Sequence, residues 1–298
     1  MEAYTDFAGV YDIFMEDTPY EAWADFLSDL IEKYGISKPL GEKERLSSRT
    51  GNLNLAEGTL AEAESTAARE EALEAERNLV LDLGCGTGTL TELLYAKGYD
   101  MIGVDNSEDM LREAFEKKEK SGSEILYLCQ DMRDLNLYGT VGTVISVCDS
   151  LNYLLEDDEI EGVFSLVNNY LYPGGLFIFD FNTVYKYEKV IGDTTIAENR
   201  ETCSFIWENF YHEQEKMNEY DLTIFVKQEK GELFRRFTET HLQRGYTLDE
   251  MLGFVERAGM EAVLCLDADT HDKPGEMSER IYVAARERGK EKRPPYEK

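Results

Sequence analysis

The chain has 298 residues, of which 42% are hydrophobic, and it carries a formal net charge of −30 at pH 7. This length allows one large domain or two small ones, and the hydrophobic share is sufficient for a packed core. The charge argues against a nucleic-acid substrate, because enzymes that act on nucleic acids gain affinity from a basic stripe, and the sequence contains none.

Neither the cysteines nor the N-terminus indicates an extracellular or membrane protein. The five cysteines are dispersed and never spaced C-x-x-C, which predicts neither a disulfide framework nor a zinc site; they are Cys85, Cys129, Cys148, Cys203 and Cys265. No basic segment followed by an apolar run opens the chain, and no apolar run reaches 18 residues. We therefore expect a cytoplasmic protein with no metal and no membrane partner.

The first 76 residues differ in texture from the rest. Apolar residues recur with helical spacing within residues 1–35, and Gly35 follows as a stop signal, so this part is predicted to be a helical cap. Residues 36–76 are rich in Glu, Ala, Ser and Gly and contain no aromatic residue. We interpret them as a flexible acidic insertion, whose later part, residues 61–76, forms a solvated helix.

Strands and helices alternate from residue 79 onward. The predicted strands are 79–83, 101–105, 125–130, 141–148 and 176–181, and the predicted helices are 89–97, 108–120 and 158–171. Repeated strand–helix units predict an α/β fold with a mostly parallel, Rossmann-like sheet and helices on both faces.

The pattern changes after residue 200. Apolar and polar residues alternate over 203–211, 220–227 and 233–242, which predicts an antiparallel meander. A capping box, Thr247 to Glu250, then opens a helix, and residues 261–266 and 280–285 are predicted as closing strands, the last of a seven-stranded sheet being antiparallel. We thus divide the chain after the insertion into a core of residues 77–200 and 245–288, an antiparallel β lid of residues 201–244 and a charged tail of residues 289–298.

The sequence Leu-Val-Leu-Asp-Leu-Gly-Cys-Gly-Thr-Gly, residues 79–88, carries the strongest functional signal. A buried strand, residues 79–83, carries Asp82 and runs into a loop with Gly84, Gly86 and Gly88, and a helix follows. Glycines allow the backbone to pass close to a ligand, and the helix N-terminus offers amide groups and positive potential to an anion. A purely structural glycine turn is the alternative.

The glycine spacing distinguishes between two cofactors. A dinucleotide site needs G-x-G-x-x-G, which would put the third glycine at position 89, where Thr stands. The D-x-G-x-G-x-G arrangement instead resembles the nucleotide-binding motif of class I S-adenosylmethionine (SAM)-dependent methyltransferases. By that resemblance Asp82, Cys85 and the three glycines belong to the SAM site.

Two further strand ends carry acidic residues. Asp105, followed by Asn106, ends the second strand about twenty residues after the loop, where a carboxylate can accept from both ribose hydroxyls; a helix-capping Asp is the alternative. In the methyltransferases that the chain resembles, an acidic residue after the third strand accepts from the adenine amino group and the next residue packs on the ring. Asp131 and Met132 fit these two positions, although an ordinary loop acid would also fit Asp131.

The end of the fourth strand faces the transferred methyl group in this family. Here the chain has Cys148, assigned to the cofactor site, and then Asn152 and Tyr153, which we expect to line the acceptor pocket. The [Asn/Asp]-Pro-Pro-[Tyr/Phe] motif of base-directed enzymes is absent from this position. His212 and His241, both in the predicted lid, are candidate bases, and a polar turn or rim histidine is the alternative for each.

The resemblance covers residues 79–181 with ordered motifs and is looser toward both ends. Residues 4–12 resemble the start of small-molecule N-methyltransferases such as the glycine and amino-sugar enzymes, in which an N-terminal helix closes over the cofactor. By that resemblance Tyr11 contacts SAM, although it also fits the apolar stripe of a helix.

We therefore expect a SAM-dependent methyltransferase that transfers a methyl group to nitrogen or oxygen of a small-molecule acceptor. The alternatives are an RNA methyltransferase, an NAD-dependent oxidoreductase and a noncatalytic SAM-binding partner protein. The meander also fits a dimer interface, and a homodimer is therefore an alternative to the lid interpretation.

Overall fold

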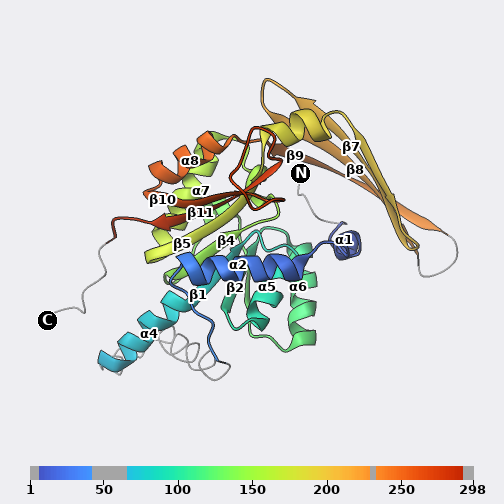
Figure 1. Ribbon diagram of the computed structural model, residues 1–298. Helices are drawn as coiled ribbons and strands as arrows, with labels where there is room; N and C mark the ends of the chain where they lie inside the picture. The colour runs from blue at the N-terminus through green and yellow to red at the C-terminus, as the bar shows by residue number, and fades with distance from the viewer. Residues whose placement is uncertain (1–6, 42–65, 229–232, 291–298) are drawn as a thin grey trace.

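The computed structural model describes residues 7–41, 66–228 and 233–290. Seven strands form the central sheet in the order β10-β11-β5-β4-β1-β2-β3 (Figure 1). These strands are β1 (Leu79–Leu83), β2 (Asp100–Asp105), β3 (Leu126–Cys129), β4 (Val141–Ser146), β5 (Leu171–Asn182), β10 (Met260–Asp267) and β11 (Arg280–Glu287). The first five pair in parallel, and β11 runs antiparallel to both β5 and β10. The predicted Rossmann-like sheet with an antiparallel last strand is confirmed.

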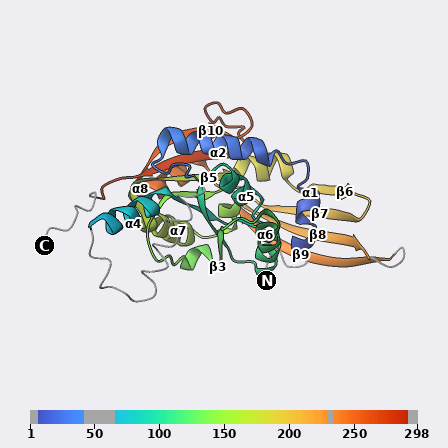
Figure 2. The ribbon, with the colours of Figure 1, turned by 90° about the horizontal axis from the view of Figure 1, so that it is seen from below.

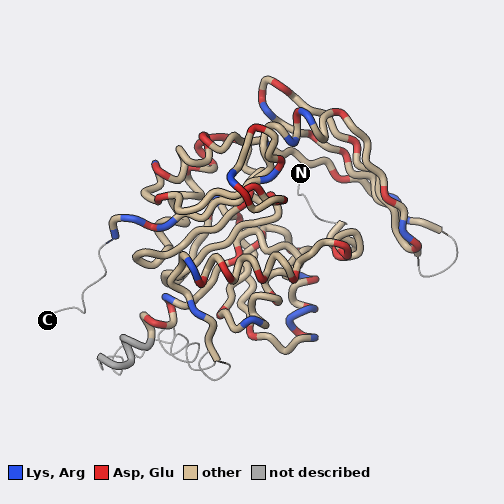
Figure 3. Tube along the Cα trace, in the orientation of Figure 1, with Lys and Arg blue, Asp and Glu red and all other residues tan. Residues whose placement is uncertain are grey.

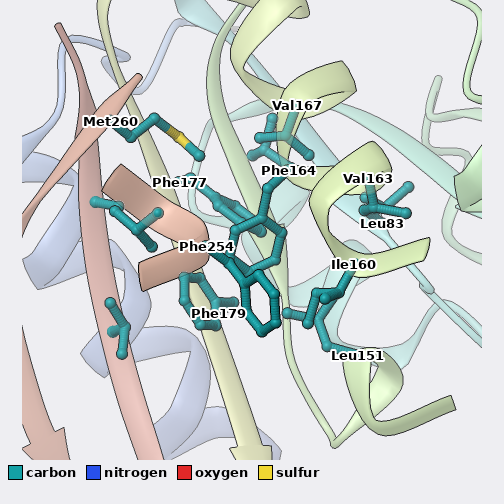
Figure 4. Packing of buried hydrophobic residues seen from close by; sticks show 14 of the residues in the cluster. Leu83, Leu151, Ile160, Val163, Phe164, Val167, Phe177, Phe179, Phe254 and Met260 are labelled. Carbon is teal, nitrogen blue, oxygen red and sulfur yellow. The ribbon is translucent and has the colours of Figure 1, made fainter. Parts of the chain in front are cut away.

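Two hydrophobic layers bury the two faces of this sheet. The helices are α1 (Ala8–Phe14), α2 (Tyr20–Tyr34), α4 (Thr66–Asn78), α5 (Thr89–Ala96), α6 (Glu108–Ser121), α7 (Asp157–Tyr170) and α8 (Leu248–Arg257). On one face Phe164 of α7 packs against Phe177 and Phe179 of β5 and Phe254 of α8 (Figure 4), with a ring-centroid distance of 5.1 Å to Phe179. Helices α2, α5 and α6 cover the other face.

Local capping signals set the starts of two helices. Thr247 accepts from the backbone amide of Glu250, and the Glu250 side chain accepts from that of Thr247, so α8 begins with the predicted capping box. Glu156 and Glu159 form the same reciprocal pair at α7. The N-terminal cap differs from expectation in one respect, since it consists of two helices interrupted before Tyr20.

The chain around the predicted insertion is anchored at both ends, and residues 42–65 lie outside the described residues. The hydroxyl of Ser37 is buried against the hydroxyl of Thr143 at 2.9 Å, and the amide of Leu40 donates to the carbonyl of Gly98 at 2.8 Å. The carboxylate of Glu76 accepts from the amide of Thr140 at 3.1 Å. Residues 36–40 and 76 therefore contact the core.

A separate antiparallel sheet follows the first five strands of the core. Its strands are β6 (Thr195–Asn199), β7 (Cys203–His212), β8 (Met217–Lys227) and β9 (Phe234–Arg244), and a π-helical segment, η3 (Lys186–Ile191), leads into it. Figures 1 and 2 show this sheet extending away from the core beside α1. Val10 of α1 packs on Tyr220, Leu222 and Ile224 of β8, so one face of the sheet covers the N-terminal helix.

Acidic and basic residues are interspersed along the described chain, and Lys and Arg do not gather into one stripe (Figure 3). No helix within the described ranges is long and apolar enough to cross a membrane.

Candidate cofactor and acceptor site

A cavity lies at the carboxyl edge of the parallel strands, where β1, β2, β3 and β4 end. Of the residues predicted from sequence, ten line it: Tyr11, Asp82, Gly84, Cys85, Gly86, Asp105, Asn106, Met132, Cys148 and Tyr153. The remaining predicted residues, Gly88, Asp131, Asn152, His212 and His241, are not part of the lining.

The glycine loop shapes one wall of this cavity. Gly84 has a φ of +82°, and a Cβ there would lie 2.6 Å from the Ser150 hydroxyl, so no larger residue fits. Gly86 has a φ of +54° and lines the cavity, and a Cβ there would meet no described atom within 4 Å. The open space beside Gly86 is thus available to a ligand. Gly88 instead forms the left-handed N-cap of α5.

Asp105 organises the loop at the end of β2. Its carboxylate accepts from the amide of Gly86 at 2.8 Å and from the amide of Ser107 at 2.9 Å. Burial raises the pKa of Asp105, and these backbone hydrogen bonds oppose that shift. The residue therefore ties the glycine loop to the second strand and borders the cavity, as a ribose-binding carboxylate must.

Asp82 is buried at the end of β1. It accepts from the Thr91 hydroxyl of α5 at 2.6 Å, which fixes the helix to the strand. Burial raises the pKa of Asp82 to about 7, the hydrogen bond from Thr91 opposes the shift, and the nearby Asp105 adds to it.

At the end of β3, Gln130 and Met132 line the cavity, whereas Asp131 does not. Both carboxylate oxygens of Asp131 accept from Arg133, the shorter contact being 2.6 Å from Nη2 to Oδ2, and this hydrogen bonding lowers the pKa of Asp131. Arg133 also contacts Glu159 of α7 at 2.7 Å. The adenine contact assigned to Asp131 stays a prediction, and Gln130 is the polar side chain on this wall.

The turn after β4 adopts an uncommon backbone. Cys148 and Asp149 have φ angles of +60° and +55°, and their amides donate to the Asp180 carboxylate at 3.1 and 2.9 Å. Arg280 of β11 pairs with Asp149 at 2.7 Å and lies 3.6 Å from Asp180. Such strain persists only where several contacts enforce it, and here it brings Cys148 to the cavity.

Asn152 has a structural role, which corrects its prediction as a pocket residue. Its Nδ2 donates to the carbonyls of Asn182 and Arg244 at 2.9 and 2.7 Å, and its Oδ1 accepts from the Asn182 amide at 2.9 Å. These bonds use the whole amide to join the short helix η2 (Ser150–Tyr153) to β5 and the end of β9.

Tyr153 connects the cavity to the lid. Its hydroxyl lies 2.9 Å from the Tyr220 hydroxyl and 3.0 Å from Nδ1 of His241. His241 therefore lies behind Tyr153, rather than in the cavity wall. His212 is at the exposed end of β7 and pairs with Glu219 at 3.0 Å, so its prediction as a pocket residue is wrong.

The N-terminal helix closes over the glycine loop. Tyr11 and Tyr20 line the cavity. Asp12 accepts from the Thr87 hydroxyl at 2.7 Å and pairs with Lys117 of α6 at 2.5 Å. Asp12 and Lys117 were not among the site residues predicted from sequence.

The cavity fits SAM by the chemistry of its walls. A carboxylate at the end of β2 can accept from ribose hydroxyls, the loop leaves space at Gly86, and Met132 offers an apolar surface to adenine. Among the described residues, no three His, Cys, Asp or Glu side chains converge in a way that could hold a metal ion.

Comparisons with known proteins agree with this assignment. A family model described as "Methyltransferase domain" matches residues 80–175. A protein of Geobacillus sp. (strain WCH70), named as a candidate methyltransferase, is 32% identical over 284 residues, which are 95% of this chain and 99% of that protein. The dTDP-3-amino-3,4,6-trideoxy-alpha-D-glucopyranose N,N-dimethyltransferase of Streptomyces venezuelae is 31% identical over 120 residues, 40% of this chain and 49% of that enzyme.

A solved structure is similar in fold over nearly the whole chain. The SAM-dependent methyltransferase from Clostridium acetobutylicum ATCC 824 has a TM-score of 0.74 at 26% identity, and the match covers 97% of this chain and 100% of that one. Relatives over nearly the full length, a shared fold and a cavity that fits SAM lead to one conclusion. The chain belongs to the class I SAM-dependent methyltransferases.

Proposed function

We propose that this methyltransferase transfers the methyl group to nitrogen or oxygen of a small-molecule acceptor. The observation that carries the proposal is the double cover over the cavity. Tyr11 and Tyr20 come from the N-terminal helices, and Tyr153 is backed by the lid through Tyr220 and His241. A site covered from two sides favours a small acceptor over a polymer.

Two further observations support this class of acceptor. The net charge of −30 opposes the approach of a polyanion such as RNA. The Streptomyces venezuelae relative is named as a dimethyltransferase of a dTDP-amino sugar, a small molecule methylated at nitrogen.

The chain's own residues hold the two reactants and exclude water. SAM supplies a methyl group that is already activated on a sulfonium. Asp105 and the glycine loop position the cofactor, and the covers of α1 and the lid keep water away from the reacting atoms. Covalent catalysis by the protein is not required.

A labelling screen tests the proposal. Purified protein is incubated with methyl-tritiated SAM and separate pools of small amines, of alcohols and phenols, and of carboxylic acids, with total tRNA in a further reaction. We expect label in the amine pool or the hydroxyl pool. A higher rate with tRNA than with any pool, or label in no reaction, would contradict the proposal.

A cofactor-site variant controls the screen. Asp105→Ala should weaken SAM binding by about 2 kcal/mol, roughly thirtyfold, because hydrogen bonds to a charged acceptor are lost. Asp109→Ala removes an acid that pairs with Arg112 at the start of α6 and does not line the cavity, so it should bind SAM as the wild type does.

A further inference from the structure

We propose that Tyr153, His241 and Glu239 form a proton relay that removes the proton from the acceptor atom as that atom is methylated. This inference rests on the proposed function and narrows its acceptor class. The acceptor carries a dissociable proton on the methylated atom, as a phenol, an alcohol or a neutral primary or secondary amine does.

The three side chains contact one another in succession from the cavity into the lid. Tyr153 lines the cavity, and its hydroxyl is 3.0 Å from Nδ1 of His241. On the opposite side of the ring, Nε2 of His241 lies 3.3 Å from Oε2 of Glu239. That contact is longer than most N–H···O bonds, as catalytic contacts often are before the reacting complex forms.

The surroundings of His241 favour one tautomer. A carboxylate beside Nε2 stabilises a proton on Nε2, which leaves Nδ1 as an acceptor for the Tyr153 hydroxyl. Glu239 is itself held by the amide of Phe7, which donates to Oε1 at 3.0 Å. The titratable groups that contact His241 in the described part of the chain are Tyr153 of η2, Tyr220 of β8 and Glu239 of β9.

The two histidines of the lid, His241 and His212, differ in how deeply their side chains are buried. The side chains of His241 and Glu239 are 0% and 6% exposed, whereas those of His212 and Glu219 are 48% and 40% exposed. A surface pair such as His212 and Glu219 costs little to keep. Burying Glu239 beside His241 costs both side chains their hydration. The position of the pair directly behind Tyr153, which lines the cavity, indicates a functional reason for this cost.

The step balances with no further reactant. The acceptor's lone pair forms the bond to the methyl carbon, and the electron pair of the broken S–C bond stays on sulfur, which becomes a thioether. The acceptor's proton passes to the oxygen of Tyr153 while the tyrosine's own proton passes to Nδ1 of His241. The resulting imidazolium is stabilised by Glu239, which is a positioning residue because it acts through His241.

Nuclear magnetic resonance of the histidine rings tests the relay without an acceptor. The protein has three histidines, so 15N-histidine labelling gives three ring systems, and His241→Gln assigns the relevant one. In the complex with S-adenosylhomocysteine we expect the proton on Nε2 and a shift of the Nδ1 signal in Tyr153→Phe. Glu239→Gln, which removes the charge but keeps the size, should mix the two tautomers. A proton on Nδ1 in the wild type would overturn the relay, because His241 would then donate to Tyr153.

Transfer rates test the same residues with the amine pool and the phenol pool as probes. Tyr153→Phe and His241→Gln should lower the transfer rate about a hundredfold at pH 7 while binding SAM within twofold of the wild type. The rate difference from the wild type should become smaller at higher pH, where hydroxide can remove the acceptor's proton in place of the relay. His212→Gln is the matched control and should keep the wild-type rate. Wild-type rates in both relay variants, or a loss equal at every pH, would overturn the relay. If the wild type methylates neither pool, the proposed function is contradicted, and the histidine tautomer still decides the relay.

Discussion

The carboxylate of Asp12 in α1 lies 2.5 Å from the ammonium of Lys117 in α6. Both residues also contact Thr87 of the glycine loop, because Lys117 donates to the carbonyl of Thr87 at 2.8 Å and Asp12 accepts from the Thr87 hydroxyl. One ion pair thus joins the cap to the part of the core that borders the cofactor. Cap closure and cofactor binding should be coupled for this reason.

Asp12→Ala should therefore weaken SAM binding. The pair is partly exposed, so we expect a loss of about 1 kcal/mol, roughly fivefold in Kd, together with faster SAM release. Calorimetry and stopped-flow fluorescence measure the two quantities. Asp29→Ala, on the exposed face of α2, serves as the control. Equal Kd values for the two variants would show that the Asp12–Lys117 ion pair does not affect cofactor binding.

The buried carboxyl of Asp82 predicts a pH dependence of stability. Burial raises its pKa from 3.8 to about 7 in the folded protein. The folded state then binds more protons than the unfolded state between these two values, so the free energy of unfolding falls as pH rises through this window. The stabilisation is fully present below pH 4 and is lost above pH 7.

Asp82→Asn removes this titration. Relative to the wild type, the variant should gain between about 2 and 4 kcal/mol in free energy of unfolding from pH 4 to pH 8. Urea denaturation of the cofactor-free proteins at several pH values measures the difference. For Asp109→Asn, the difference in free energy of unfolding from the wild type should not change with pH. If the difference for Asp82→Asn is also independent of pH, the pKa of Asp82 is not raised in the folded protein.

Contiguous motifs could be predicted from the sequence, whereas contacts between distant residues could not. The glycine loop and Asp105 lie on a strand–loop–helix unit whose backbone geometry follows from residue spacing. Lys117 resembles an ordinary surface charge in sequence, and only the fold brings it to Asp12. Glu239 and His241 are two residues apart on one strand, but only the fold brings His241 to Tyr153.

Two errors of the sequence analysis have local physical causes. Asn152 lies beside a cavity-lining residue, but topology does not fix the direction of its side chain, which turns inward to bond Asn182. Strand β6 was missed because Thr-Ile-Ala-Glu-Asn has little apolar alternation and pairs as an edge strand with β7 alone.

Arg280 should be important for stability because it is paired within a buried cluster. Burial raises the pKa of Asp180, and the charge of Arg280 opposes that shift. Arg280→Met would leave Asp180 and Asp149 without their cation, which costs roughly 3 kcal/mol in free energy of unfolding. Arg288→Met is the control, since Arg288 is exposed and lies 3.6 Å from Glu261, and it should cost less than about 0.5 kcal/mol. Urea denaturation compares the two, and similar losses would contradict the role of the cluster.

The anchors at Ser37 and Glu76 limit the part of the acidic insertion that can be replaced without loss of stability. We expect that only residues 42–65 can be replaced by a Gly/Ser linker of about ten residues without loss of stability, because their composition, poor in large apolar residues, does not offset the entropy of ordering them. Calorimetry should give a melting temperature within a few degrees of the wild type, by the usual scaling. Glu76→Ala, in contrast, removes the acceptor of the Thr140 amide and should cost about 1 to 2 kcal/mol. A drop of more than about 10 °C on replacing residues 42–65 would show that the segment packs on the core.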